Sequence, residues 1–375
     1  MLPDDARIIS VDDHVIEHPR VWLDRLPAKY QDRAPRIIRL EDGNDAWLYD
    51  GERSGNFALN AVAGKHPRDF GMDPRSYSDM RDGCHDVEAR LKDMDIEGTW
   101  AQMCFPNMGG FAGSTFWRSK DKELAAACIT AYNDFILDEW CAFNPERQIP
   151  LCMVPFWDVP AAVKEAERVA AKGAKSITFL EAPHRLGLPS YHTDHWDPLL
   201  KVCEEAELPL SVHFGSGGAP AGTAEDGDMF ITIALFGLNS MMAMVDLLMS
   251  PVFYKFPTLK FVLAEGGIGW IPYLLERTDY SWERHRYWCK INAEQRPSEL
   301  FDDHIFGCFV SDQTGLNERY QIGVNNILFE SDYPHSDCNW PHTRKVLAEQ
   351  LRDVPDDEAR LIVEGNARRI FNFPG

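Results

Sequence analysis

Short apolar runs, most of them separated by segments with helical periodicity, recur along the whole chain of 375 residues. Each run is only a few residues long and rich in aliphatic side chains, as are strands buried on both faces of a parallel sheet. Eight such runs alternating with helices match the number of strands that closes a (β/α)8 barrel. The sequence therefore predicts an α/β fold of the TIM-barrel class, with strands in residues 8–11, 99–105, 148–154, 175–180, 208–214, 259–264, 305–310 and 326–329.

Residues 18–85 interrupt this alternation, because the distance between the first two runs is far too long for a single helix. The segment is rich in Pro, Gly, Asp and Arg, and long loops at the mouth of a barrel usually form lids or contact surfaces. We therefore expect one domain over residues 1–375, with residues 18–85 as an insertion or lid over the C-terminal face. Helices are predicted in residues 86–97, 120–143, 159–172, 195–207, 228–249, 267–290 and 341–373.

The overall charge excludes one class of partner. With a net charge of −21 and a pI near 4.9, the chain lacks the clustered Lys and Arg that nucleic acid requires, although a small anionic substrate is not excluded. The nine cysteines form no CxxC pair, and several lie inside apolar runs, as reduced core residues do. No signal pattern opens the chain and no apolar stretch reaches the roughly 18 residues of a membrane helix, so we expect a cytoplasmic protein without a membrane partner.

The first predicted strand ends in the polar residues Asp12, Asp13 and His14. Active sites of (β/α)8 barrels lie at the carboxyl ends of the strands, where these side chains would emerge. Residues two apart point to the same side of an extended chain, so Asp12 and His14 place a carboxylate and an imidazole side by side. An isolated Asp-x-His is more often a turn cap beside a packed imidazole, so this interpretation depends on what the other strands supply.

Three further strands end in residues of the same chemical types. The fifth run ends near His213, the sixth is followed by Glu265, and the eighth is followed by Asp332 and His335. A barrel brings these ends to one face although they are remote in sequence. Carboxylates and imidazoles in this number suit a divalent ion such as Zn²⁺, with one position left for water or substrate. Chance polar loop residues are the alternative.

The sequence around these residues resembles the amidohydrolase superfamily, and most closely the branch with aminocarboxymuconate-semialdehyde decarboxylase, gamma-resorcylate decarboxylase and other metal-dependent hydrolases. The resemblance covers most of the chain and is weakest in residues 18–85. It is carried by the motifs Val11-Asp-Asp-His-Val-Ile-Glu, Ser211-Val-His-Phe-Gly, Ser331-Asp-Tyr-Pro-His, Tyr191-His-Thr-Asp-His-Trp-Asp-Pro and Gly365-Asn-Ala-Arg-Arg-Ile-Phe.

The resemblance implies a barrel with one divalent ion, a small-molecule substrate and a homodimeric assembly. Zinc is the first choice of metal and manganese the second. The implied ligands are Asp12, His14, His213 and Asp332. Asp12 stands where relatives carry His or Glu, which keeps a ligand and changes its charge.

Two departures from the family pattern bear on the reaction. The end of the fourth strand reads Phe179-Leu-Glu-Ala, without the Lys that dinuclear relatives carbamylate, which favours one ion over two. At the end of the sixth strand the decarboxylase relatives carry His, whereas this chain has Glu265. A glutamate there can accept a proton from water at the metal. It would also repel a substrate carboxylate, by about 4 kcal/mol for like charges about 4 Å apart.

These departures favour a metal-dependent hydrolase that attacks an amide, ester or lactone bond of a small cyclic or aromatic substrate. Its catalytic residues would be Asp332, Glu265 and His335, although Glu265 could instead support a ligand histidine and His335 could orient Asp332. The alternative is a non-oxidative decarboxylase, a carboxy-lyase, in which Asp332 protonates the ring carbon. A third hypothesis is a barrel that has lost catalysis and only binds a ligand.

Four other residues are candidates for contacts around the substrate. His192, Trp117 and Arg81 are predicted to contact the substrate itself. Glu17, three residues after His14, is predicted to pair with an arginine of the lid.

Overall fold

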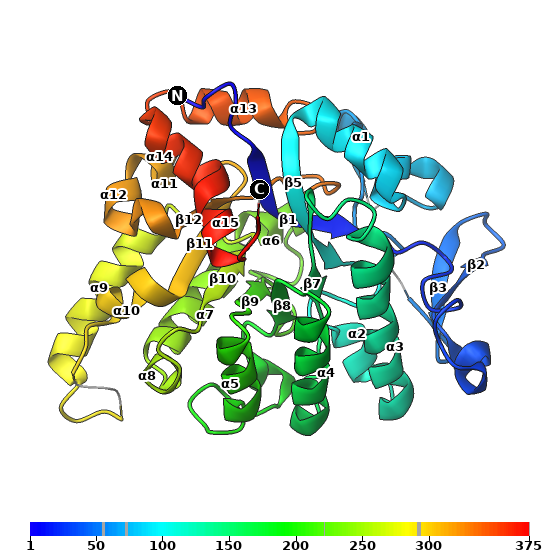
Figure 1. Cartoon of the computed structure of the whole chain (residues 1–375), viewed down its shortest axis with the longest axis horizontal. Helices are drawn as coiled ribbons and strands as arrows, with labels where there is room; N and C mark the ends of the chain where they lie inside the picture. The colour runs from blue at the N-terminus through cyan, green and yellow to red at the C-terminus, as the bar shows by residue number, and fades with distance from the viewer. Residues whose placement is uncertain (55–56, 72–73, 221, 291–293, 375) are drawn as a thin grey trace.

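The computed structural model describes residues 1–54, 57–71, 74–220, 222–290 and 294–374. Within these ranges short parallel strands occupy the centre of the molecule and helices surround them (Figure 1). Every predicted strand position is confirmed. The strands are β1 (Ile8–Val15), β5 (Thr99–Pro106), β6 (Gln148–Ile149), β7 (Leu151–Cys152), β8 (Ser176–Phe179), β9 (Leu210–His213), β10 (Phe261–Ala264), β11 (Ile305–Phe309) and β12 (Ile327–Phe329).

Parallel pairing arranges these strands in two arcs, β1-β5-β6 and β7-β8-β9-β10-β11-β12. The predicted strand over residues 148–154 is divided at Pro150, because proline has no N–H to donate to a neighbouring strand. At the other junction the chain that follows β12 runs beside β1. The amide of Asp332 donates to the Asp12 carbonyl at 2.9 Å, and the amide of His14 donates to the Tyr333 carbonyl at 2.7 Å. The two arcs therefore follow one another in the strand order of a (β/α)8 barrel.

The helices follow the predicted pattern, with three divisions. The helix predicted over residues 120–143 ends as a regular α-helix at Phe135, and the one predicted over 228–249 is divided before Gly237. The segment predicted over 341–373 contains three α-helices, and the second follows Pro355. None of the helices in the described ranges has the length and apolarity to cross a membrane. They are α1 (Val87–Glu97), α2 (Ser114–Arg118), α3 (Lys122–Phe135), α4 (Val159–Ala171), α5 (Asp197–Glu205), α6 (Met229–Ala234), α7 (Gly237–Leu248), α8 (Val252–Lys255), α9 (Ile271–His285), α10 (Pro297–His304), α11 (Gln313–Asn317), α12 (Arg319–Ile322), α13 (Thr343–Gln350), α14 (Asp356–Arg360) and α15 (Asn366–Ile370).

Alternate strand residues fill the space between the strands, and the intervening ones pack against the helices. This alternation is the two-residue period of a strand, and it leaves the strand ends as the place where polar side chains emerge. The predicted packing of the C-terminal segment against the barrel is confirmed, because it joins the same buried cluster. The cluster comprises Ile9, Val11, Ala101, Met103, Phe105, Ile149, Leu151, Val262, Ala264, Phe306, Cys308, Leu328, Ala367, Ile370, Phe371 and Phe373.

The segment after β1 carries a small antiparallel sheet of β2 (Arg36–Arg39), β3 (Asp45–Tyr49) and β4 (Glu52–Arg53), seen at the right of Figure 1. It packs on α3 through buried aromatic residues, and the Trp22 indole donates to the Cys128 carbonyl at 3.0 Å. Leu59 and Asn60, from the same segment, line the cavity described below. The division into one domain and the role of residues 18–85 as a lid remain predictions.

Helix α1 carries a buried carboxyl at its C-terminal end. Glu97 accepts a hydrogen bond from the Thr343 hydroxyl of α13 at 2.6 Å. Burial, reinforced by the charge of Asp13, raises the pKa of Glu97 to about 8. The carboxyl therefore keeps its proton in the folded chain over a pH range in which the unfolded chain has lost it.

We predict that Glu97→Gln changes how stability depends on pH. Between about pH 5 and 8 the folded chain holds one more proton than the unfolded chain, so the free energy of unfolding falls as pH rises. The uncharged glutamine is free of this effect. Relative to the unsubstituted protein, the variant should gain up to about 1.4 kcal/mol for each pH unit in this window. Urea unfolding at several pH values measures the difference, with exposed Glu88→Gln on the same helix as control. Equal pH slopes for both proteins would contradict the assignment.

Candidate metal centre

The end of β1 supplies two of the converging side chains. Asp12 and His14 are both fully buried, and their spacing puts them on the same side of the strand, as predicted. Asp13 between them points elsewhere and accepts hydrogen bonds from the Ser10 hydroxyl at 2.9 Å and from the Tyr333 amide at 3.2 Å. The strand thus divides its carboxylates between the two sides.

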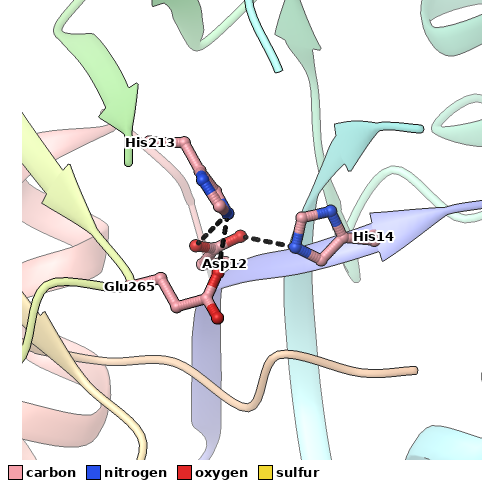
Figure 2. Close-up of side chains that lie close together, drawn as sticks. All are labelled: Asp12, His14, His213 and Glu265. Carbon is pink, nitrogen blue, oxygen red and sulfur yellow. Dashed lines mark ion pairs between the residues drawn. The ribbon is translucent and has the colours of Figure 1, made fainter. Parts of the chain in front are cut away.

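Strands β9 and β10 bring the next two groups. Their register pairs His213 with Ala264, so Glu265 follows directly beside the imidazole. Figure 2 shows Asp12, His14, His213 and Glu265 pointing toward one point. His213 Nε2 lies 2.9 Å from Glu265 Oε2 and 3.6 Å from Asp12 Oδ2, and His14 Nε2 lies 3.4 Å from Asp12 Oδ1. One donor atom from each of the four residues lies within 4.8 Å of the others.

A second group shares His14 with the first. Asp332 Oδ1 lies 3.2 Å from His14 Nε2 and 3.0 Å from His335 Nδ1. Donor atoms of His14, Asp332 and His335 also lie within 4.8 Å of one another. The structure therefore places the predicted ligands and catalytic residues in two groups that share His14, and Asp332 belongs to the second group while Asp12 and His213 belong to the first.

The inward-facing atoms fit a divalent cation. Among the described residues, no hydrogen-bond partner is found for either carboxylate oxygen of Asp12, for Nε2 of His14 and His213, or for Oδ2 of Asp332. Buried polar atoms are otherwise nearly always paired, and these are carboxylate oxygens and imidazole nitrogens, the donors that zinc and manganese accept. The Phe214 carbonyl, 2.8 Å from Nδ1 of His213, fixes the ring proton there and leaves the Nε2 lone pair facing inward.

Burial controls the protonation of the two imidazoles. Burial, and then the charge of His335, lowers the pKa of His14 to about 4. Burial and the neighbouring His14 keep the pKa of His213 well below its usual range. Both shifts favour neutral imidazole, the form that binds a metal.

The carboxyls respond differently from one another. Burial and then the charges of Asp332 and Asp12 raise the pKa of Glu265 well above its usual value, and burial raises the pKa of Asp12 in the same direction. For Asp332 burial also acts upward, but the nearby His335 and His14 outweigh it and hold the pKa of this carboxyl below its usual range. Asp332 is thus the carboxylate that the protein's own side chains keep ionised.

Arg90 of α1 supports this arrangement from beneath. Its buried guanidinium donates to the carbonyls of His14 and Gly83, each at 2.5 Å, and to the Gln102 side chain at 2.9 Å. The same group lies 4.3 Å from the ring centroid of Tyr333, the residue after Asp332. One cation thus contacts the backbone of a ligand on β1 and the ring beside a ligand that follows β12.

A cavity of about 350 Å³ opens over the metal centre. Its walls combine aromatic rings with a few polar groups. Nearby, α7 begins so close to the loop after β10 that a Cβ at Gly237 would lie 2.8 Å from the Gly266 carbonyl oxygen. The lining residues are Leu59, Asn60, Phe111, Phe214, Gly215, Pro220, Thr232, Ile233, Phe236, Glu265, Asp332, His335, Ser336 and Asp337.

The three predicted substrate contacts are not among these lining residues. His192 is exposed on the loop after β8, and its Nε2 lies 2.8 Å from Asp246 of α7. Trp117 of α2 packs on Trp157, with ring centroids 6.1 Å apart. The Arg81 guanidinium makes two hydrogen bonds to Asp93, at 2.9 and 2.6 Å. Each side chain is held by a partner on a helix or loop outside the cavity.

Glu17 also has a different partner from the predicted lid arginine. Its buried carboxyl accepts hydrogen bonds from the backbone amides of Asn107 at 3.1 Å and Met108 at 2.9 Å. It therefore ties the loop after β5 to the end of β1. Backbone amides satisfy this buried group where an arginine was expected.

Glu330 and Phe111 contact the groups at the strand ends and were not predicted from the sequence. Glu330 accepts a hydrogen bond from the Glu265 amide at 2.9 Å, and its position two residues before Asp332 was an available signal. Phe111 stacks on His213 with ring centroids 3.7 Å apart. It lies on the loop after β5, where no periodicity marks it.

We predict that His213→Ala abolishes metal retention. Removing one of the converging donors leaves too few ligands in a buried site, so metal per chain should fall from about one to near zero after dialysis. Elemental analysis measures this. His192→Ala, which removes an exposed imidazole, should retain the metal. Equal metal content in the two variants would contradict the site.

We also predict that Arg90→Met destabilises the protein and weakens metal retention. The substitution leaves buried carbonyls unpaired and should lower the free energy of unfolding by about 3 kcal/mol. Urea unfolding with and without metal measures the loss, and Lys92→Met, on the exposed face of α1, is the matched control. A loss of stability with unchanged metal affinity would show that Arg90 supports the fold and not the ligands.

Relatives with assigned names share most of the chain at low identity. A 2-keto-4-carboxy-3-hexenedioate hydratase of Sphingobium sp. is 24% identical over 305 residues, which is 76% of this chain and 80% of the relative. A gamma-resorcylate decarboxylase of Rhizobium sp. is 24% identical over 307 residues, 77% of this chain and 88% of the relative.

Solved structures show the same fold. An amidohydrolase from Mycobacterium avium subsp. paratuberculosis K-10 superposes with a TM-score of 0.74 at 20% identity, covering 98% of this chain and 100% of that one. A 5-carboxyvanillate decarboxylase from Novosphingobium aromaticivorans, solved with manganese and 4-hydroxy-3-methoxy-5-nitrobenzoic acid, gives a TM-score of 0.67 at 18% identity and covers 98% of this chain and 96% of that one. The predicted barrel class is therefore confirmed.

The prediction of a hydrolase is wrong, because the relatives' names favour decarboxylation. That prediction took Glu265 as a full negative charge facing a substrate carboxylate, whereas burial raises its pKa and weakens the repulsion. The predicted superfamily is confirmed. The model of the amidohydrolase family matches residues 17–373, and the chain belongs to that family of enzymes.

Proposed function

We propose that the protein is a metal-dependent carboxy-lyase that removes carbon dioxide from a hydroxylated aromatic or cyclic carboxylic acid. One observation carries the proposal: the buried groups at the strand ends adjoin a cavity that Glu265, Asp332 and His335 line together with aromatic rings, in a family whose relatives include a gamma-resorcylate decarboxylase. Apolar walls with a few fixed polar groups are typical of sites for small cyclic molecules.

One divalent ion would be held by Asp12, His14, His213 and Asp332, with Glu265 near enough to add a further oxygen. Bound there, it would supply positive charge for the substrate carboxylate and an adjacent oxygen. The donor set suits both zinc and manganese. We favour manganese over the zinc first predicted, because a structural relative contains it.

Asp332 and His335 would deliver the proton. The 3.0 Å contact between Asp332 Oδ1 and His335 Nδ1 allows the two groups to share one proton, and both line the cavity. Because Asp332 is itself kept ionised, the shared proton would reach it from His335 as it passes to the ring carbon that bears the carboxylate, and its arrival there allows the carbon–carbon bond to break. Its electron pair then returns to the ring and carbon dioxide leaves. Water restores the proton.

The aromatic residues would orient the ring. Phe214 and Phe236 stack with centroids 3.6 Å apart, and Phe111 lies against His213. Such faces bind a planar substrate by offset or edge contacts without competing for its carboxylate. The homodimer implied by the family resemblance is also a proposal, and light scattering measures it.

Product analysis tests the reaction. The manganese- and zinc-loaded proteins are incubated with a panel of ortho-hydroxybenzoic acids in deuterium oxide. We expect release of carbon dioxide and one deuterium at the vacated ring carbon. Incorporation of labelled oxygen from solvent, or addition of water to an unsaturated acid as the hydratase relative's name describes, would overturn the proposal.

We predict that Asp332→Asn lowers kcat by at least about a hundredfold, because asparagine cannot transfer the proton. Metal content is measured on the same sample, and Glu265→Gln serves as a comparison that alters a neighbouring carboxyl. A fall in kcat explained wholly by lost metal, and reversed by excess metal, would assign Asp332 to binding alone.

A further inference from the structure

We propose, resting on the proposed function, that the cavity accepts aromatic monocarboxylates whose other ring substituents are uncharged and discriminates against acids with a second carboxylate. The basis is the absence of Lys and Arg from the described cavity lining, together with the charge of the exposed residue Asp337. Its acidic residues are Glu265, Asp332 and Asp337. No Lys or Arg lines the cavity in the described part of the chain, and none of the positions outside the described ranges is Lys or Arg in the sequence.

A single cation at the metal centre compensates the carboxylate that leaves. A second carboxylate on the same ring would lie either against apolar walls or nearer the mouth. Against Phe111, Phe214 and Phe236 it would lose water without gaining a counter-ion, which is costly for a charged group. Among the described lining residues the imidazole of His335 is the one group that can become positive, and it already lies 3.0 Å from Asp332, so neither position offers the second carboxylate a counter-ion of its own.

The mouth repels a second carboxylate for a different reason. Asp337 lines it and is exposed, so its charge faces any group that projects outward from the ring. The exposed Arg185 donates to the Ala219 carbonyl at 2.6 Å and is not part of the lining. Asp337 is therefore the residue to which we assign the discrimination at the mouth.

The cavity lining offers hydrogen-bonding groups to uncharged polar substituents of the ring. The Asn60 amide donates to the Ser336 hydroxyl at 2.7 Å, and its buried Oδ1 has no hydrogen-bond partner among the described residues. Thr232 adds a hydroxyl to the same lining. Neutral amide and hydroxyl groups of this kind suit a phenolic hydroxyl or a methoxy group.

A matched pair of ligands tests the inference by calorimetry on the manganese-loaded protein. The ligands are 2-methoxy-6-nitrophenol and 4-hydroxy-3-methoxy-5-nitrobenzoic acid, which differ only by a ring carboxylate. We expect the nitrophenol to bind at least about tenfold more tightly, because like charges at partly screened distances cost this much. Asp337→Asn should narrow the ratio severalfold, whereas Glu88→Gln, an equal change of charge outside the cavity, should leave it unchanged.

Equal binding of the two ligands, tighter binding of the nitrobenzoic acid, or binding of neither would overturn the inference. An unchanged ratio in Asp337→Asn would overturn the role of Asp337. Because these measurements report binding and not turnover, a preference for the nitrophenol without release of carbon dioxide from any acid would refute the proposed reaction and leave the charge selectivity standing.

Discussion

The backbone pairing between β1 and the segment after β12 is the constraint on which the metal centre depends. Two hydrogen bonds, from Asp332 to Asp12 and from His14 to Tyr333, hold predicted ligands from opposite ends of the chain side by side, with His14 Nε2 3.2 Å from Asp332 Oδ1. The positions of the predicted ligands are therefore set by the backbone of the parallel strands, and only small changes in side-chain conformation would be needed to bind an ion. A site of this kind forms only when the barrel has formed.

Burying carboxylate oxygens and imidazole nitrogens that lack hydrogen-bond partners raises the free energy of the folded chain. Three neighbouring residues reduce this cost. Arg90 places one fully buried positive charge beneath the ligands, where it contacts the His14 carbonyl and the Tyr333 ring. Glu17 accepts a hydrogen bond from the Met108 amide, on the loop after β5 that also carries Phe111 of the cavity wall. Glu330 accepts a hydrogen bond from the amide of Glu265. These contacts hold the strand ends in place, and a bound cation would compensate what charge remains.

The raised pKa of Glu265 removes the reason for which hydrolysis was predicted. The hydrolase prediction treated Glu265 as a fixed negative charge. In the folded chain the carboxyl is largely removed from water and lies near Asp332 and Asp12, and its neutral form is favoured. The pKa of a buried carboxyl depends on neighbours that come from other strands. The sequence therefore allowed Glu265 to be selected but did not reveal that its neutral form is favoured.

The apolar runs and the polar residues that follow them were sufficient to predict the barrel and to select the residues at its strand ends, because the side-chain alternation of a strand and the residues after its last apolar position are local features of the sequence. These residues are Asp12, His14, His213, Glu265, Asp332 and His335. The cavity wall was not predictable in this way. His192, Trp117 and Arg81 were selected by residue type, and partners on other elements hold them outside the cavity. Asn60, Phe111 and Asp337 entered the wall only through the tertiary arrangement of loops, whose paths no periodic pattern encodes.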